Sequence, residues 1–181
     1  SVTPWQMVTA YSVFANGGYR ISPFIVREIQ DEKGQALAEA QPVTAGDESL
    51  LAIDPRNAYL MDSMLRGVTI YGTAARASAT LKRRDLAGKT GTTNEQVDAW
   101  FCGYQRTVVA CSWIGFDQPK SLGGRETGGS AALPTWIAYM GKVLKDVPES
   151  FMPQPDGLAT LEVPNSGKGP TKELFYKENV P

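Results

Sequence analysis

Residues 88–94 read Gly-Lys-Thr-Gly-Thr-Thr-Asn, and two unrelated chemistries use the tripeptide Gly-Lys-Thr. In a phosphate-binding P-loop, a glycine lies five residues before this tripeptide, backbone N–H groups hold the phosphates, and a helix follows. Here Arg83 stands where that glycine is needed, and residues 97–104, Val-Asp-Ala-Trp-Phe-Cys-Gly-Tyr, are rich in strand-forming types. The sequence therefore argues against a nucleotide site.

The second chemistry is acyl transfer by a serine, in which Lys-Thr-Gly lies on a strand at the edge of the pocket. Lys89 supplies positive charge, the hydroxyls of Thr90 and Thr92 can donate to a carboxylate, and Gly91 lets a substrate approach the backbone. As a bare tripeptide the motif is weak, and a surface turn is the commoner setting for it. The chain has no histidine, which excludes Ser-His-Asp triads and the commonest zinc sites. A serine enzyme built on this sequence therefore needs lysine as its base.

Longer segments on both sides of the run favour the acyl-transfer interpretation. They read Thr-Pro-Trp-Gln-Met at 3–7, Phe-Ala-Asn-Gly-Gly at 14–18, Tyr-Gly-Thr-Ala at 71–74, Asp-Leu-Ala-Gly-Lys-Thr-Gly-Thr-Thr-Asn at 85–94, Asp-Ala-Trp-Phe at 98–101, Trp-Ile-Gly-Phe-Asp at 113–117, and Arg-Glu-Thr-Gly-Gly at 125–129. In this order they resemble the transpeptidase domain of class A penicillin-binding proteins, over residues 1–150. The resemblance implies a β-lactamase/transpeptidase-like fold.

The chain departs from the family pattern in one respect. The family carries a Ser-x-x-Lys and a Ser-x-Asn element as well as Lys-Thr-Gly, but no serine here has lysine three residues on or asparagine two residues on. We therefore expect Ser1 to be an internal point of a longer protein. The N-terminal remainder of that protein is expected to supply the nucleophilic serine and its lysine, and the isolated chain is expected to be inactive.

The resemblance implies a peptidoglycan D,D-transpeptidase that cross-links stem peptides by serine acyl transfer and is a target of β-lactams. Lys89 would then lend its charge to the substrate and to the proton shuttle. Thr90 and Thr92 would bind the terminal carboxylate, and Gly91 and Thr93 would complete the binding strand. The backbone N–H of Thr92 would form half of the oxyanion hole.

Arg125 and Thr127 lie in a glycine-rich loop, and they either border the pocket or belong to a structural turn between a strand and a helix.

Two alternatives remain open at this stage. One is a serine β-lactamase or D,D-carboxypeptidase of the same superfamily, which shares the motif. The other is a noncatalytic penicillin-sensing or structural module, in which an incomplete pocket would be natural.

Composition limits the partners. The net charge of −1 gives no electrostatic footprint for nucleic acid, and we expect neither a metal nor a cofactor. No apolar run approaches the roughly 20 residues of a membrane span, so we expect no membrane contact by this segment. The resemblance implies a membrane-anchored parent whose domain lies on the periplasmic, extracytoplasmic side of a bacterial inner membrane.

Caps and periodicity predict an α/β fold, an antiparallel sheet flanked by helices on both faces. The predicted elements are a helix from Thr3 to Asn16, a hairpin of residues 24–30 and 35–38, a second helix from Asp54, a short helix at 73–79, a strand around Lys89, a hairpin of 99–104 and 108–116, a helix from Pro134, and a hairpin of 158–163 and 174–176. Residues 1–150 are predicted to form the partial transpeptidase domain and 151–181 a Pro/Gly-rich extension that either docks or stays free.

Three local predictions depend on finer detail. Thr3 and Gln6 have the form of a capping box. In the second helix, an apolar stripe facing the core is expected to comprise Met61, Met64, Leu65 and Val68. The basic run at 82–84 is predicted to be a solvated connection into the strand of Lys89.

Cys102 and Cys111 lie on two predicted strands joined around residues 105–107. With a two-residue loop the cysteines fall diagonally, and with a three-residue loop they point to opposite faces. Neither register places them at disulfide distance. We therefore expect two free, reduced, buried cysteines that say little about the compartment.

Overall fold

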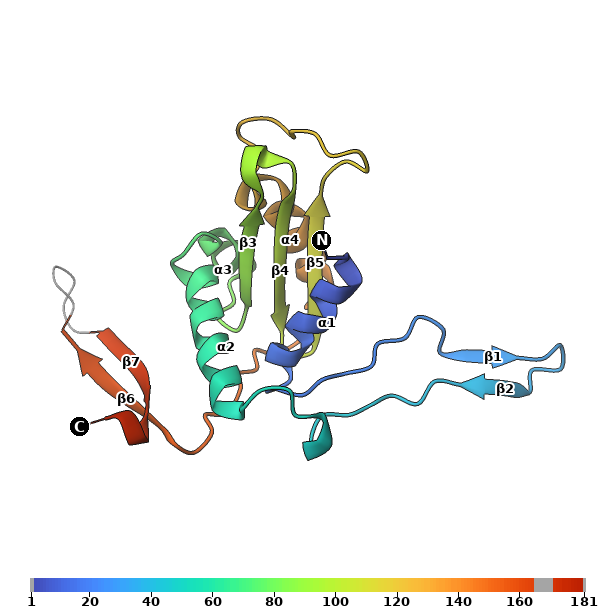
Figure 1. Ribbon diagram of the computed structural model, residues 1–181, viewed down its shortest axis with the longest axis horizontal. Coiled ribbons are helices and arrows are strands. Elements are labelled where there is room, and N and C mark those ends of the chain that lie inside the picture. The colour runs from blue at the N-terminus through green and yellow to red at the C-terminus, as the bar shows by residue number, and fades with distance from the viewer. Residues whose placement is uncertain (1, 165–170, 181) are drawn as a thin grey trace.

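The centre of the molecule is an antiparallel sheet whose strand order is β3 (Ala87–Thr92), β4 (Ala99–Gln105), β5 (Val108–Ile114). The computed structural model describes residues 2–164 and 171–180. β3 lies at one edge of the sheet and carries the Lys-Thr-Gly-Thr run (Figure 1). The predicted α/β class with an antiparallel sheet is confirmed.

Helices cover both faces of this sheet, as predicted. They are α1 (Pro4–Ala15), α2 (Pro55–Ile70), α3 (Ala75–Leu81) and α4 (Leu133–Val143). On one face, α1 and α2 enclose a cluster that includes Leu65 and Tyr104. On the other face, α3 and α4 enclose a larger cluster in which the Phe101 and Trp136 ring centroids lie 4.8 Å apart. Figure 1 shows α1 in front of the sheet and α4 behind it.

The helix starts confirm the predicted caps. The Thr3 hydroxyl accepts from the Gln6 N–H at 3.2 Å, and the Gln6 side chain accepts from the Thr3 N–H at 2.8 Å. Asp54 caps α2 by accepting from the Arg56 N–H at 2.8 Å. The stripe on α2 was predicted wrongly in one place, because Met64 is 59% exposed. Its position is rotated by about 60° from that of Met61, which places it at the rim of the stripe.

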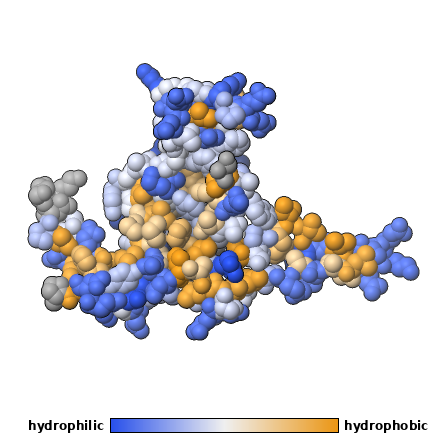
Figure 2. All heavy atoms as spheres, in the orientation of Figure 1, coloured by the Kyte–Doolittle hydropathy of each residue, from blue (hydrophilic) through white to orange (hydrophobic). Residues whose placement is uncertain are grey.

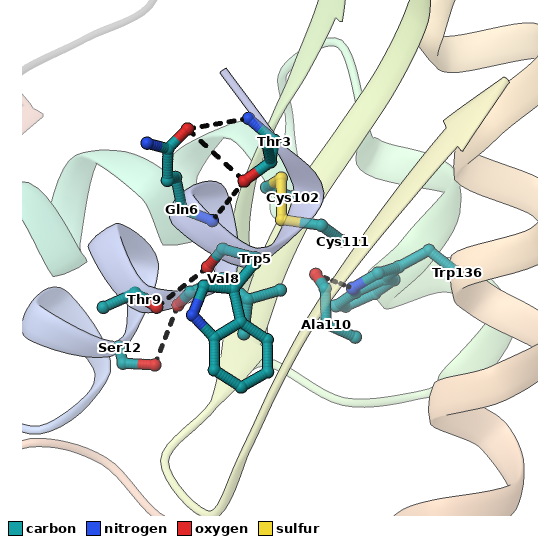
Figure 3. Close-up of a disulfide and its surroundings, with 10 residues drawn as sticks. All are labelled: Thr3, Trp5, Gln6, Val8, Thr9, Ser12, Cys102, Ala110, Cys111 and Trp136. Atoms are coloured by element: carbon teal, nitrogen blue, oxygen red, sulfur yellow. Dashed lines mark hydrogen bonds between the residues drawn. A yellow bond between two sulfur atoms is a disulfide. The ribbon is translucent and has the colours of Figure 1, made fainter. Parts of the chain in front are cut away.

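The β4–β5 hairpin corrects the prediction for the cysteines. Gln105 pairs with Val108, so the loop is two residues long, and Cys102 lies directly opposite Cys111 with their Cα atoms 4.1 Å apart. The two cysteines form a disulfide. It lies on the face that α1 covers, and Figure 3 shows it beside α1.

The register error has a physical cause in a buried side chain. The sequence predicts Gln105 in the turn, where a two-residue loop would place the cysteines diagonally, but Gln105 is fully buried at the end of β4 and the loop consists of Arg106 and Thr107. Its amide donates to Asp85 at 3.0 Å and its carbonyl oxygen accepts from the Thr107 N–H at 2.9 Å. These bonds keep Gln105 in the strand, which shifts the turn by one residue and brings the cysteines together.

The segment that leads into β3 is anchored rather than solvated. Arg83 donates to Asp85 at 2.9 and 2.8 Å and to the Val147 carbonyl at 2.6 Å, so the prediction of a solvated run was wrong at Arg83. Burial acts to raise the pKa of Asp85, but the hydrogen bonds from Arg83, the Ser150 N–H and Gln105 outweigh it and hold this pKa below its ordinary value. The start of β3 is thereby fixed to two other segments, residues 147–150 and the end of β4.

Two hairpins extend from the body (Figure 1). The first comprises β1 (Glu28–Gln30) and β2 (Ala36–Glu39), and Figure 2 shows apolar atoms exposed along it. The second, predicted in the C-terminal extension, comprises β6 (Leu158–Val163) and β7 (Thr171–Tyr176), with residues 165–170 outside the described part.

The C-terminal extension docks on α2. Arg56 forms an ion pair with Glu178 at 2.7 Å and lies 4.8 Å from the centre of the Tyr176 ring. The division of the chain at residue 150 stays a prediction. Among the described residues, no helix combines the length and the apolar character needed to span a membrane.

Candidate active site

The predicted site residues lie together along β3 and just after it. Lys89, Thr92 and Thr93 are exposed, whereas Thr90 and Gly91 are half-buried. β4 pairs with only one edge of β3, so within the described residues no strand occupies the other edge. Because side chains alternate along a strand, Lys89 and Gly91 face the side of α1 and α2, and the two threonines between and after them face the side of α3 and α4.

Thr92 is held by a residue from a distant loop. The Gly128 N–H donates to Thr92 Oγ1 at 3.0 Å, although 36 residues separate them. A hydroxyl has one proton and two acceptor lone pairs. Since Thr92 accepts from Gly128, its own proton remains available to an anion on the exposed side.

Gly128 is also pressed against the backbone of β3. It opens a π-helical turn, η3 (Gly128–Ala132), and a Cβ built on it would lie 2.5 Å from the Gly91 carbonyl oxygen and 2.9 Å from the Gly91 nitrogen. A third backbone atom, the Trp100 carbonyl oxygen, lies still closer. Only glycine fits between these groups, and its fit sets how closely the loop approaches the strand.

Thr90 lies at the centre of a small polar cluster. Lys89 Nζ donates to the Thr90 carbonyl oxygen at 2.9 Å and to Thr90 Oγ1 at 3.2 Å. Thr73 Oγ1 lies 2.9 Å from Thr90 Oγ1. Thr73 belongs to the turn between α2 and α3. Together with Thr92, this cluster places the Lys89 ammonium group and three threonine hydroxyls on one short stretch of surface.

Arg125 and Thr127 lie in the loop that leads to Gly128. Thr127 caps η3, because its hydroxyl accepts from the Ser130 N–H at 3.2 Å and its own N–H donates to Ser130 Oγ at 2.8 Å. The Arg125 carbonyl accepts from the Ser130 hydroxyl at 2.6 Å, and its side chain is exposed. These contacts describe a structured turn next to β3. A binding role for Arg125 and Thr127 stays a prediction.

The turn that follows β3 is fixed by Asp98. The Asp98 N–H donates to Thr93 Oγ1 at 2.7 Å, and the Asp98 carboxylate accepts from Trp113 Nε1 at 2.8 Å. Thr93 therefore has a structural bond inside the protein. Across the sheet, Lys89 pairs with Cys102, and Cys102 pairs with Cys111, to which it is bonded in the disulfide. Lys89 and the disulfide therefore lie side by side on the same face of the sheet.

Thr73 and Gly128 are the two contributors that sequence reasoning missed. Both lie in segments that carry the family resemblance, Tyr-Gly-Thr-Ala at 71–74 and Arg-Glu-Thr-Gly-Gly at 125–129. No local pattern gives either residue a role, because each acts through contact with β3.

Comparisons with known proteins identify the family and the fold. The sequence profile described as penicillin binding protein transpeptidase domain matches residues 1–135. The chain is 50% identical to penicillin-binding protein 1A of Neisseria lactamica over 178 residues, covering 98% of this chain and 21% of that protein. It is 38% identical to penicillin-binding protein 1A of Pseudomonas aeruginosa over 234 residues, covering 100% of this chain and 28% of that protein.

The crystal structure of penicillin-binding protein 1A from Haemophilus influenzae superimposes with a TM-score of 0.85 at 31% identity, covering 97% of this chain and 32% of that one. This likeness confirms the predicted β-lactamase/transpeptidase-like fold. The chain spans between about a fifth and a third of the length of these relatives. With a matching profile over most of its length, this chain belongs to the penicillin-binding protein transpeptidase domain family.

Proposed function

We propose that this chain forms the Lys-Thr-Gly side of a peptidoglycan D,D-transpeptidase active site. The nucleophilic serine and its lysine come from a part of the parent protein outside these 181 residues. The observation that carries the proposal is the exposed edge strand β3, on which the Thr92 hydroxyl already accepts from Gly128 and the Lys89 ammonium lies against Thr90. Such an edge presents donors for an extended peptide that ends in a carboxylate.

The proposed reaction begins with a stem peptide lying along the open edge of β3. Thr90 and Thr92 donate to its terminal carboxylate. The serine hydroxyl passes its proton to the neighbouring lysine as its oxygen attacks the carbonyl carbon between the two D-alanines, and the Thr92 N–H and the N–H of the serine stabilise the oxyanion. The C–N bond breaks, that proton passes to the leaving nitrogen, the terminal D-alanine leaves as a free amine, and an acyl-enzyme remains. An amine of a neighbouring stem peptide then attacks this ester, and its proton returns to the serine oxygen as the serine is released.

Lys89 supports both halves of this reaction with its charge. β-lactams acylate the same serine, because they present a strained amide beside a carboxylate.

The disulfide supports placement on the extracytoplasmic side, since structural disulfides persist in oxidising compartments. A membrane anchor, on this proposal, belongs to another part of the parent protein.

Penicillin labelling of the complete protein tests the division of the site. We expect a fluorescent penicillin to form a stable adduct, and peptide mapping by mass spectrometry to place it on a serine outside residues 1–181, because no serine here has lysine three residues on. An adduct on a serine within the chain would contradict the proposal. Rapid hydrolysis of the adduct would favour the β-lactamase alternative. Release of D-alanine without the formation of cross-links would favour the carboxypeptidase. The absence of any adduct on the folded protein would favour the noncatalytic module.

Thr92→Val in the complete protein tests carboxylate recognition. Valine keeps the β-branched shape that suits a strand but removes the hydroxyl. Hydrogen bonds to charged groups contribute roughly 1.5–3 kcal/mol, so the acylation rate constant should fall about 10- to 100-fold. For an analogue whose carboxylate is amidated, the rate constant should fall much less between the parent and the variant, because the contact with the carboxylate is already missing. Equal losses for acid and amide would show that Thr92 only holds the strand.

A further inference from the structure

Thr73 contacts the candidate site from a rigid turn outside the Lys-Thr-Gly run. Its Oγ1 lies 2.9 Å from Thr90 Oγ1, across 17 residues of sequence. The next residue, Ala74, is fully buried and its N–H donates to the Val68 carbonyl at 3.0 Å. On the other side, a Cβ on Gly72 would lie 2.7 Å from Val68 Cα, so the turn packs tightly on α2. The exposed Thr73 hydroxyl is thus presented to Thr90 from a fixed backbone.

The protons of the two hydroxyls can be arranged in two ways. Thr90 Oγ1 already accepts from Lys89 Nζ at 3.2 Å, and in the contact with Thr73 either oxygen can donate. If Thr90 donates to Thr73, its only proton is used inside the protein. If Thr73 donates, Thr90 accepts twice and its proton is available to a ligand.

We propose that Thr73 is a positioning residue that donates to Thr90 when an anion occupies the site, so that Thr90 donates its own proton to the substrate carboxylate. The proposal rests on the proposed function. A hydrogen bond to an ionised carboxylate is roughly twice as strong as one between neutral groups, so the anion sets the direction of the pair. Thr73 touches no substrate in this arrangement and acts only through Thr90.

The test uses the complete protein with Thr73→Val and Thr73→Ala, which both remove the hydroxyl. We expect acylation by a penicillin with a free carboxylate to slow about 2- to 10-fold, the effect of one neutral hydrogen bond. Acylation by the carboxyl-amidated analogue should change by less than about twofold, because the amide offers no ionised carboxylate for the Thr90 proton. Thr73→Ser should restore the rate with the acid. The matched control is Thr80→Val, an exposed threonine on α3, which should leave both rates unchanged.

A double variant separates positioning from a general structural effect. If Thr73 acts through Thr90, adding Thr73→Val to Thr90→Val should cause almost no further loss. A full additional loss in that background, or equal losses for acid and amide, would overturn the proposal. A parent protein that reacts equally with acid and amide would overturn the proposed carboxylate recognition itself. Acid preference in the parent with no effect of either Thr73 variant would overturn only the role of Thr73.

Discussion

Replacing Lys89 by alanine in the complete protein is expected to lower the rate constant of penicillin acylation about 10²- to 10³-fold, the usual effect of removing one preorganised electrostatic group. The Lys89 ammonium is exposed and donates to the Thr90 carbonyl oxygen at 2.9 Å, so its charge lies beside the unpaired edge of β3, where the substrate is proposed to bind. The acylation rate constants of the free acid and of the amidated analogue should both fall, because the charge serves the chemistry as well as binding.

The measurement for Lys89→Ala is the second-order rate constant of labelling, with thermal unfolding as a check on the fold. Lys142→Ala is the matched control, since Lys142 is an exposed lysine in the last turn of α4 and distant in sequence from the motif. It should label at the parent rate. If Lys89→Ala also labels at the parent rate while remaining folded, the Lys-Thr-Gly run is not part of the acylation site.

Gly128→Ala is expected to reduce acylation by about 10²-fold or more. A methyl group at this position would lie 2.5 Å from the Gly91 carbonyl oxygen, which no real Cβ tolerates, so the loop must withdraw from β3. The Gly128 N–H then loses Thr92, and the Thr92 hydroxyl loses its orientation. A displacement of about 1 Å in a catalytic site can cost this much in rate.

Gly124→Ala provides the comparison for Gly128→Ala, because it lies in the same loop and a Cβ there meets no atom within 4 Å. Labelling kinetics and the midpoint of thermal unfolding should both stay near those of the parent for Gly124→Ala. Retention of full labelling by Gly128→Ala would mean that the contact of η3 with β3 does not determine the geometry of the site.

Local signals predicted much of the fold. Thr3 with Gln6, and Asp54 before Pro55, fix helix starts because a cap satisfies backbone N–H groups within a few residues. Register is decided differently. The β4–β5 turn depends on buried Gln105, which bonds to Asp85 twenty residues away, so a shift of one residue could not be read from the hairpin sequence alone.

The candidate site also contains residues that a local pattern predicts and residues that only packing brings in. Lys89, Thr90 and Thr92 lie within four consecutive positions of one strand, so the motif alone places them together. Thr73 and Gly128 reach that strand from 17 and 36 residues away through the packing of α2, α3 and η3. Sequence patterns within one element carry no information about such contacts, which arise only when the elements pack.

The disulfide between Cys102 and Cys111 also determines where a reductant can attack this face of the sheet. The two cysteines lie nine positions apart in the sequence, and their bond lies on the face that α1 covers. Cys102 is 2% exposed, whereas Cys111 on the neighbouring strand is half-buried. Thiol–disulfide exchange requires an attacking thiolate to reach one sulfur atom of the bond. In the folded domain we therefore expect that attack to begin at Cys111 rather than at Cys102.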